Sequence, residues 1–262
     1  MRAKGRFTDE LASSFLIAEE TGVPIAPISS IHPDLAEDDA YRVQRRIVSA
    51  KVESGDKVIG WKIGATSQAI QQMLGIDEPV YGVLLQSHRA TSGGKLSLSS
   101  LIHPRIECEI AFLIGRQIVG PGATSSDVLE ATEAVLASLE INDPRTAEWE
   151  VGRHEVIADN GLAARFVLGE QRMEPTGLEL RNAEAVLLKN GEQITKSTGE
   201  AVLGDPANAV AWLANKLAEH GQVLEAGNLV LPGSLTPIYP VEAGDKFEAI
   251  FDYLGSVSIE FE

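Results

Sequence analysis

The sequence predicts an α+β fold in which a helical N-terminal cap, residues 1–55, precedes a β-rich domain of residues 56–262. Helical spacing of apolar residues dominates the first part, whereas from Lys57 onward short runs of alternating polarity are separated by glycines. The second part lacks the regular strand–helix alternation of a doubly wound parallel sheet. We therefore expect a mixed, β-rich body with helices inserted into it.

Two helices are predicted in the cap. The first has Thr8 or Asp9 as its N-cap and ends before Gly22. The second runs from about residue 37 to about residue 53. Four apolar residues at helical spacing form its buried face: Ala40, Val43, Ile47 and Ala50.

The first half of the β-rich domain predicts two strands and a helix. Residues 58–63 alternate in polarity, which places Lys62 on the opposite face from Ile59, Trp61 and Ile63. Residues 106–114 form a second, strongly apolar strand. Residues 126–138 are predicted to be a helix that begins at Ser126 or Asp127. Its expected buried set is Val128, Val135, Leu136 and Leu139.

The second half predicts a hairpin, a helix and two terminal strands. Asn190-Gly191 between two short apolar runs is typical of a type I′ turn. Asp205-Pro206 supplies an N-cap and a proline in the first turn of a helix that ends near His220-Gly221. The terminal strands alternate at Phe247, Ala249 and Phe251, and again at Val257, Ile259 and Phe261.

Composition excludes several classes of partner. The net charge is −16 and the sequence pI is about 4.7, which argues against nucleic acid and against an anionic membrane surface. The negative net charge does not exclude a small anionic substrate, because the electrostatic field at the binding site matters more than the net charge. No stretch approaches the roughly 18 apolar residues of a membrane span. The single cysteine, Cys108, excludes an intrachain disulfide, and we expect a cytoplasmic protein.

Three carboxylates form the sharpest chemical pattern. Glu107 and Glu109 share one face of a strand, because residues two apart point the same way. An ordinary solvated face is the alternative reading, but this strand continues as an apolar run that predicts burial. Glu140 lies between apolar neighbours just after the predicted helix. Like charges that are buried together need a basic partner or a cation, and three oxygen ligands without His or Cys favour Mg²⁺ or Mn²⁺ over Zn²⁺.

Other residues are open to two interpretations. Lys62 lies between glycines and is either a solvated lysine or one that holds a carboxylate or moves a proton. His154 and Glu155 form either an acid/base pair or a polar pair in a loop. Asp159-Asn160-Gly161 is most simply a turn. Thr198-Gly199 and Gly233-Ser234 can present hydroxyl and backbone N–H groups to an anion.

Several blocks in this order resemble the fumarylacetoacetate hydrolase superfamily, and within it the 2-oxopent-4-enoate hydratase / 4-oxalocrotonate decarboxylase branch. The blocks span nearly the whole chain: residues 37–44 (EDDAYRVQ), 60–67 (GWKIGATS), 104–112 (PRIECEIAF), 139–140 (LE), 158–160 (ADN), 203–213 (LGDPANAVAWL) and 255–261 (GSVSIEF). The resemblance implies a mixed β-roll or sandwich for the C-terminal, catalytic domain, and a homo-oligomer that also associates with another enzyme of its pathway.

The resemblance also implies roles for individual residues. Glu107, Glu109 and Glu140 would hold Mg²⁺ or Mn²⁺, and Lys62 would be the active-site lysine. Glu155 or Asp159 would handle water. The residues expected to bind the substrate are Lys62, Asn160, Thr198 and Ser234.

The expected reaction is hydration of a 2-hydroxydienoate, the tautomer of a 2-oxo acid, in aromatic meta-cleavage catabolism. Decarboxylation of 4-oxalocrotonate is the main alternative. The departures bear on this choice, because Val80 stands where hydratases of the branch usually have Asp, and Leu162 where many members have Ser. Hydrolysis of an acylpyruvate C–C bond, with His154 and Glu155 activating water, and a non-catalytic partner subunit also remain open.

Overall fold

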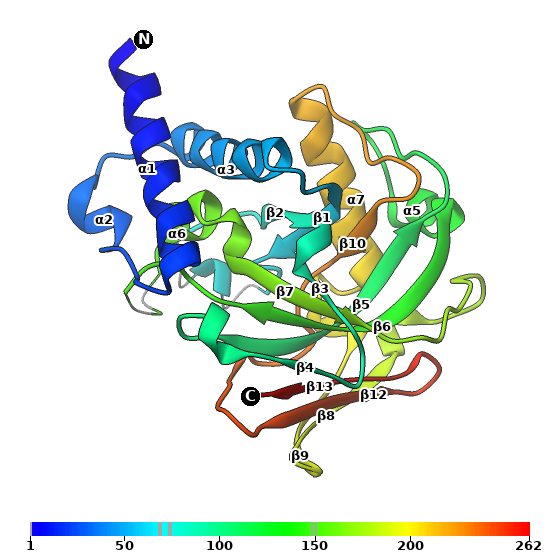
Figure 1. Ribbon diagram of the computed structural model, residues 1–262. Coiled ribbons are helices and arrows are strands. Elements are labelled where there is room, and N and C mark those ends of the chain that lie inside the picture. The colour runs from blue at the N-terminus through cyan, green and yellow to red at the C-terminus, as the bar shows by residue number, and fades with distance from the viewer. Residues whose placement is uncertain (1, 68–69, 73–74, 148, 150) are drawn as a thin grey trace.

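Helices gather at the N-terminal end of the chain, and two sheets form most of the rest (Figure 1). The computed structural model describes residues 2–67, 70–72, 75–147, 149 and 151–262. The α+β class with a helical N-terminal part is confirmed. The division of the chain into domains at residue 55 stays a prediction. The helices are α1 (Arg2–Thr21), α2 (Ile28–Ile31), α3 (Glu37–Glu53), α5 (Ser125–Ala131), α6 (Arg153–Ala158) and α7 (Pro206–Glu219).

Of the two N-terminal helices, the second matches its predicted bounds and the first does not. Helix α1 begins at Arg2, so Thr8 is a buried residue inside the helix and neither Thr8 nor Asp9 is its N-cap. The residues before Thr8 contain no proline, and most of them favour helix, so the helix continues through them. Its end is as predicted, since Gly22 has φ +68° and its N–H donates to the carbonyl of Ala18.

A large mixed sheet lies at the centre of the molecule. Its strands follow the order β2-β1-β10-β5-β6-β7-β3, and β11 pairs with β5 beside this path. The bounds are β1 (Val58–Gly64), β2 (Val80–Leu85), β3 (Arg89–Ala90), β5 (Arg105–Ile114), β6 (Thr132–Asn142), β7 (Ala163–Leu168), β10 (Leu229–Leu231) and β11 (Tyr239–Pro240). The β1–β10 and β3–β7 pairs are parallel, and the other pairs of this sheet are antiparallel.

The large sheet is strongly curled. Strands β2 and β3 stand at opposite ends of the strand order, yet only the short 3₁₀ helix η1 (Gln86–His88) separates them in the chain. The side chain of Asn160, just before β7, holds the curl closed. Its Oδ1 accepts from the N–H of Val83 on β2 at 2.8 Å, and its Nδ2 donates to the carbonyl of Val83 at 2.9 Å.

The helix predicted over residues 126–138 is wrong beyond Ala131. Helix α5 ends there, and β6 follows directly and pairs with β5 along nearly its whole length. The N-cap is Thr124, which forms a capping box with Asp127, in place of Ser126 or Asp127. Almost every residue of β6 is buried on both faces, so the strand shows no polar alternation that would distinguish it from a buried helix.

A second sheet covers one side of the large one, with the order β4-β13-β12-β8-β9. The predicted hairpin is confirmed, because Asn190 and Gly191 both have positive φ, 55° and 84°. Helix α7 is also confirmed, with Asp205 as its N-cap. The strands are β4 (Gly94–Leu96), β8 (Glu184–Lys189), β9 (Glu192–Thr198), β12 (Lys246–Phe251) and β13 (Gly255–Phe261), and further 3₁₀ turns are η2 (Leu98–Ser100), η3 (Asn160–Leu162), η4 (Leu180–Asn182) and η5 (Gly199–Ala201).

The two faces of β5 enter different environments. Ile106, Cys108 and the next alternate residues join the main core, which includes the second sheet and the helices. The opposite face, which carries Glu107, Glu109 and Ala111, points into the interior of the curl. A small apolar cluster fills the middle of this interior: Leu84, Ala111, Ala134, Leu136, Phe166, Leu229 and Leu231. The fold therefore places two glutamates inside the curled sheet, beside an apolar filling.

None of the helices in the described part of the chain has the length and apolar character needed to cross a membrane.

Candidate metal centre

Three carboxylates converge at one end of the curl, two of them buried and one, Glu107, half-buried. Glu107 on β5 lies directly opposite Glu140 on β6 in the antiparallel register, and Glu109 follows on the same face. One oxygen from each of the three lies within 4.8 Å of the others. Glu140 thus reaches the cluster from near the C-terminal end of strand β6, and not from a position just after a helix as expected from the sequence.

The hydrogen bonds of these carboxylates leave oxygens without partners. Glu107 Oε1 accepts from Nδ2 of Asn142 at 2.9 Å, and Glu109 Oε2 accepts from the N–H of Gly233 at 2.9 Å. Oε1 of Glu109 and Oε1 of Glu140 have no hydrogen-bond partner in the described part of the chain. Buried oxygens without partners are costly. An all-oxygen set of this kind fits a hard divalent cation such as Mg²⁺ or Mn²⁺.

The proximity of the carboxylates changes their protonation. Burial, followed by the charge of Glu140, raises the pKa of Glu107 to about 7, while Lys62 and hydrogen bonds act in the opposite direction. Burial and the charges of Glu140 and Glu107 raise the pKa of Glu109 well above its ordinary range. The cluster is therefore unfavourable as a set of free anions, and a cation would relieve it.

Lys62 stands beside the cluster. Its Nζ lies 3.1 Å from Glu140 Oε2 and donates to Asn142 Oδ1 at 3.1 Å and to the carbonyl of Gly161 at 2.9 Å. Burial alone would lower the pKa of Lys62, but Glu140, Glu107 and Glu109 raise it above its ordinary value, so the side chain is an ammonium.

Two glycines make room for this lysine. A Cβ at Gly161 would lie 2.7 Å from Cδ of Lys62, and one at Gly82 would lie 3.2 Å from the same atom. Gly161 also has φ +66°, a conformation that residues with a Cβ rarely adopt. The backbone around Lys62 is thus built to admit its alkyl chain.

A cavity of about 610 Å³ opens next to the cluster. Its polar side carries Lys62, Glu107, Asn142 and Thr66, together with Arg105, whose guanidinium stacks over the ring of Trp149 at 4.2 Å. The remaining lining is largely apolar and includes Ile70, Trp149, Val151, Val156, Leu162, Leu235, Pro237 and Ile238. The volume suits a small organic molecule with one polar end.

Among the expected catalytic residues, Glu155 and Asp159 do not line this cavity. Glu155 is buried, and its Oε1 accepts from the N–H of Ser29 at 2.7 Å, which ties α6 to α2. Asp159 is fully buried and forms an ion pair with Arg145 at 2.5 Å. Both side chains therefore hold the fold together, and their catalytic roles stay predictions without geometric support.

The expected substrate-binding residues divide in the same way. Ser234 lines the cavity, although its hydroxyl donates to the carbonyl of Thr236 at 2.7 Å. Asn160 is engaged with the backbone of Val83 and, like Thr198 and His154, is not part of the lining.

Two polar lining residues were missed by the sequence analysis. Asn142 bridges Lys62 and Glu107, and Arg105 lies directly opposite Asn142 in the β5–β6 register. The signal was the alternation Glu140-Ile141-Asn142, which places both polar side chains on one face of a strand. It was hidden because this segment was expected to follow a helix.

Comparison with known proteins agrees with this geometry. The family model "Fumarylacetoacetate (FAA) hydrolase C-terminal" matches residues 61–261. The chain is 41% identical over 239 residues to a 2-hydroxyhexa-2,4-dienoate hydratase of Comamonas testosteroni, and the aligned residues cover 90% of each chain. It is 39% identical over 237 residues to a 4-oxalocrotonate decarboxylase of Pseudomonas sp. (strain CF600), again over 90% of each.

A solved structure extends the similarity to the whole fold. The 4-oxalocrotonate decarboxylase from Pseudomonas putida G7, complexed with magnesium and adipate, superposes with a TM-score of 0.95 at 35% identity, covering 98% of both chains. The matched family model covers both β5 and β6, which carry the glutamates, and also Lys62. The chain belongs to the fumarylacetoacetate hydrolase family.

Proposed function

We propose that this protein is a Mg²⁺-dependent lyase of the 2-keto-4-pentenoate hydratase type, with Mg²⁺ or Mn²⁺ held by Glu107, Glu109 and Glu140. The observation that carries the proposal is the convergence of three carboxylates, with unpartnered buried oxygens, beside the ammonium of Lys62. The hydratases and decarboxylases among its relatives, and the magnesium in a solved relative, support the same assignment.

The side chains around the cavity suit a small 2-oxo acid. A bound divalent ion supplies Lewis acidity that stabilises negative charge on the 2-oxo oxygen. The Lys62 ammonium attracts the substrate carboxylate and is placed to move a proton. Asn142 accepts from Lys62 and donates to Glu107, so it fixes the orientation of both. The apolar walls hold the carbon chain and limit the access of water.

4-Oxalocrotonate decarboxylation is the second candidate. Arg105 places a further cation in the cavity, where it can pair with the second carboxylate of a dicarboxylic substrate. Val80 is buried on β2 and offers no acid where hydratases of the branch usually have Asp. Leu162 adds apolar surface to the cavity where many relatives have a serine hydroxyl.

Substrate assays with Mg²⁺ distinguish these functions. Loss of the absorbance of 2-hydroxypenta-2,4-dienoate without CO₂ release indicates the hydratase, and CO₂ release from 4-oxalocrotonate indicates the decarboxylase. Pyruvate release from an acylpyruvate would indicate the C–C hydrolase instead. Magnesium binding without turnover of any of the three would contradict a lyase and favour a non-catalytic partner subunit. Glu140→Gln is the inactive control, and Glu130→Gln, an exposed glutamate on α5, is the matched active control.

We also propose that the protein is a cytoplasmic homo-oligomer that associates with another enzyme of its pathway. Exposed large apolar side chains in the N-terminal segment, Ile17, Val23 and Ile31, support self-association. The free, buried thiol of Cys108 suits a reducing compartment. Light scattering of the purified protein tests the first point, and a monomeric mass at micromolar concentration would contradict it.

A further inference from the structure

The interior of the curled sheet has a second end. Glu109, Ala111 and Leu113 follow one another on the same face of β5, so Leu113 lies about 14 Å along the strand from Glu109. The small apolar cluster lies between them. At the far end a second cavity opens, and none of the residues that the structure describes lines both this cavity and the one beside the metal centre.

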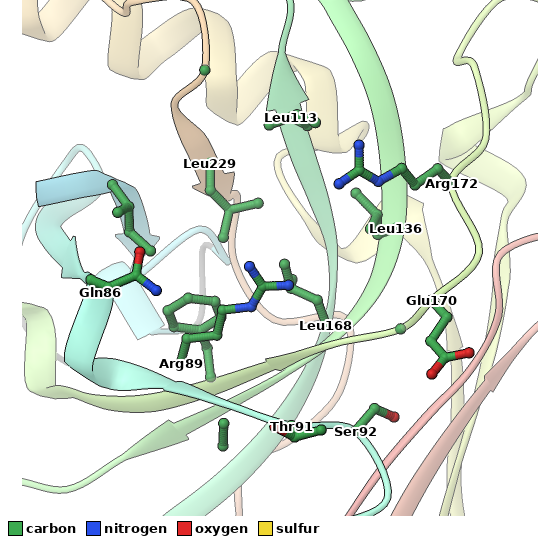
Figure 2. A pocket seen from close by; sticks show the side chains of 15 residues that line it. Gln86, Arg89, Thr91, Ser92, Leu113, Leu136, Leu168, Glu170, Arg172 and Leu229 are labelled. Carbon is green, nitrogen blue, oxygen red and sulfur yellow. The ribbon is translucent and has the colours of Figure 1, made fainter.

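This second cavity has the size and floor of a ligand site. Its volume is about 630 Å³, within the range of small-molecule pockets, and it lies at the mouth of a curled sheet, where such pockets are common. Five apolar side chains from β5, β6, β7 and β10 form the floor: Leu113, Leu136, Phe166, Leu168 and Leu229. The four leucines are labelled in Figure 2. An apolar molecule or group of six to ten carbons, roughly, would be covered by such a floor.

Two arginines give the cavity a positive charge. Figure 2 shows the guanidinium groups of Arg89, on β3, and Arg172, after β7, directed toward the apolar floor from different sides. Arg89 forms no ion pair with any residue that the structure describes. Arg172 has only a long contact of 3.6 Å with the exposed Glu133. Among the described residues that line the cavity, Glu170 is the single one with a carboxylate.

This positive charge is unusual for the molecule as a whole. The chain has a net charge of −16, and several of its described surface arginines, such as Arg46 and Arg181, pair with acidic neighbours. A purely apolar occupant would make no polar contact with either guanidinium group. An anion with an apolar body satisfies the floor and the arginines together.

We propose that this second cavity binds a small organic carboxylate with an apolar body, whose carboxylate lies between Arg89 and Arg172 and whose body packs on the floor formed by Leu113, Leu136 and Leu229. The site is separate from the metal centre and does not depend on the function proposed for it. A second copy of the chain is a less suitable occupant, because the site is a concave pocket and not an extended face.

The test uses decanoate and 1-decanol, which share an alkyl chain and differ in charge. Each competes with 8-anilinonaphthalene-1-sulfonate, whose fluorescence reports binding to the protein. We expect decanoate to displace the dye at lower concentration than 1-decanol. The double variant Arg89→Gln/Arg172→Gln should weaken decanoate roughly fivefold and leave 1-decanol unchanged, because exposed ion pairs are individually weak. Arg181→Gln, which removes one exposed arginine elsewhere, is the matched control.

Three results would overturn the proposal. Equal displacement by the acid and the alcohol would remove the role of charge. Decanoate binding that the double variant leaves unchanged would place the ligand elsewhere, for example beside Lys62. Failure of decanoate to displace the dye would also refute the proposal, and a change of mass in the double variant by light scattering would then make this surface an interface between copies of the chain. Circular dichroism of each variant shows whether it is folded.

Discussion

Replacing Glu107 with glutamine should stabilise the metal-free protein and abolish its stabilisation by magnesium. In the folded chain Glu107 has a pKa of about 7, compared with an ordinary value of 4.5. The folded state therefore binds more protons than the unfolded state between these values, and stability falls as the pH rises through this window. Glutamine keeps the acceptor for Asn142 Nδ2 but has no charge to bury.

The size of the effect follows from the two pKa values. The difference between 4.5 and about 7 corresponds to about 3 kcal/mol at pH 8, and this is an upper bound because Glu107 is partly exposed to the cavity. Without metal, Glu107→Gln should be more stable than the wild type by about 1 to 3 kcal/mol at pH 8, and the difference should vanish near pH 4.5. At magnesium concentrations of about 100 times Kd, the wild type should gain about 2.7 kcal/mol, whereas the variant should gain almost nothing.

Urea unfolding followed by circular dichroism measures both quantities, once with EDTA and once with saturating MgCl₂. Glu130→Gln removes an exposed glutamate and should leave both curves in place. If Glu107→Gln proves less stable than the wild type in EDTA, the carboxylate is structural. If magnesium stabilises the variant as much as the wild type, Glu107 does not hold the ion.

Three further outcomes are expected. Lys62→Met should lower kcat by about 100-fold or more, and an unchanged kcat would contradict this. Magnesium binding, measured by calorimetry, should be retained or strengthened in this variant, because the positive charge beside the ion is lost. Asp159→Asn should lower the free energy of unfolding in urea by about 3–5 kcal/mol, because Arg145 loses its ion-pair partner. The KM of this variant should not rise, and a large increase in KM would support a catalytic role for Asp159. Burial and then the charge of Lys51 lower the pKa of His88 from 6.5 to about 3, so proton uptake by His88 on unfolding should lower stability by about 2 kcal/mol between pH 7 and pH 5, opposite to the contribution of Glu107. The contribution is the difference between the wild type and His88→Leu in urea unfolding at the two pH values, and an equal change in both proteins would refute it.

Elements with a clear local pattern could be predicted from the sequence. The hairpin at Asn190-Gly191 and the helix beginning at Asp205 follow from turn and cap chemistry within a few residues. Strand β6 could not be predicted, because both of its faces are buried and its register with β5 depends on residues far away in the chain. The same error concealed Asn142, whose position on the site face follows only from the strand.

The candidate site shows the same division. Glu107 and Glu109 could be placed on one face because their spacing alone determines it. Glu155, Asp159 and Asn160 look equally suited to chemistry in the sequence, but their partners are Ser29, Arg145 and Val83. Spacing along the chain cannot reveal these tertiary partners, and so it cannot distinguish a polar residue that holds the fold from one that faces the substrate.

A crystal grown with Mn²⁺ and measured at the manganese absorption edge tests the metal centre most directly. A single strong anomalous peak should lie among the carboxylate oxygens of Glu107, Glu109 and Glu140, at about 2.1–2.3 Å from each, and it should be absent in Glu140→Gln crystals. A map without a peak between these side chains, or with the manganese bound elsewhere in the molecule, would contradict the assignment.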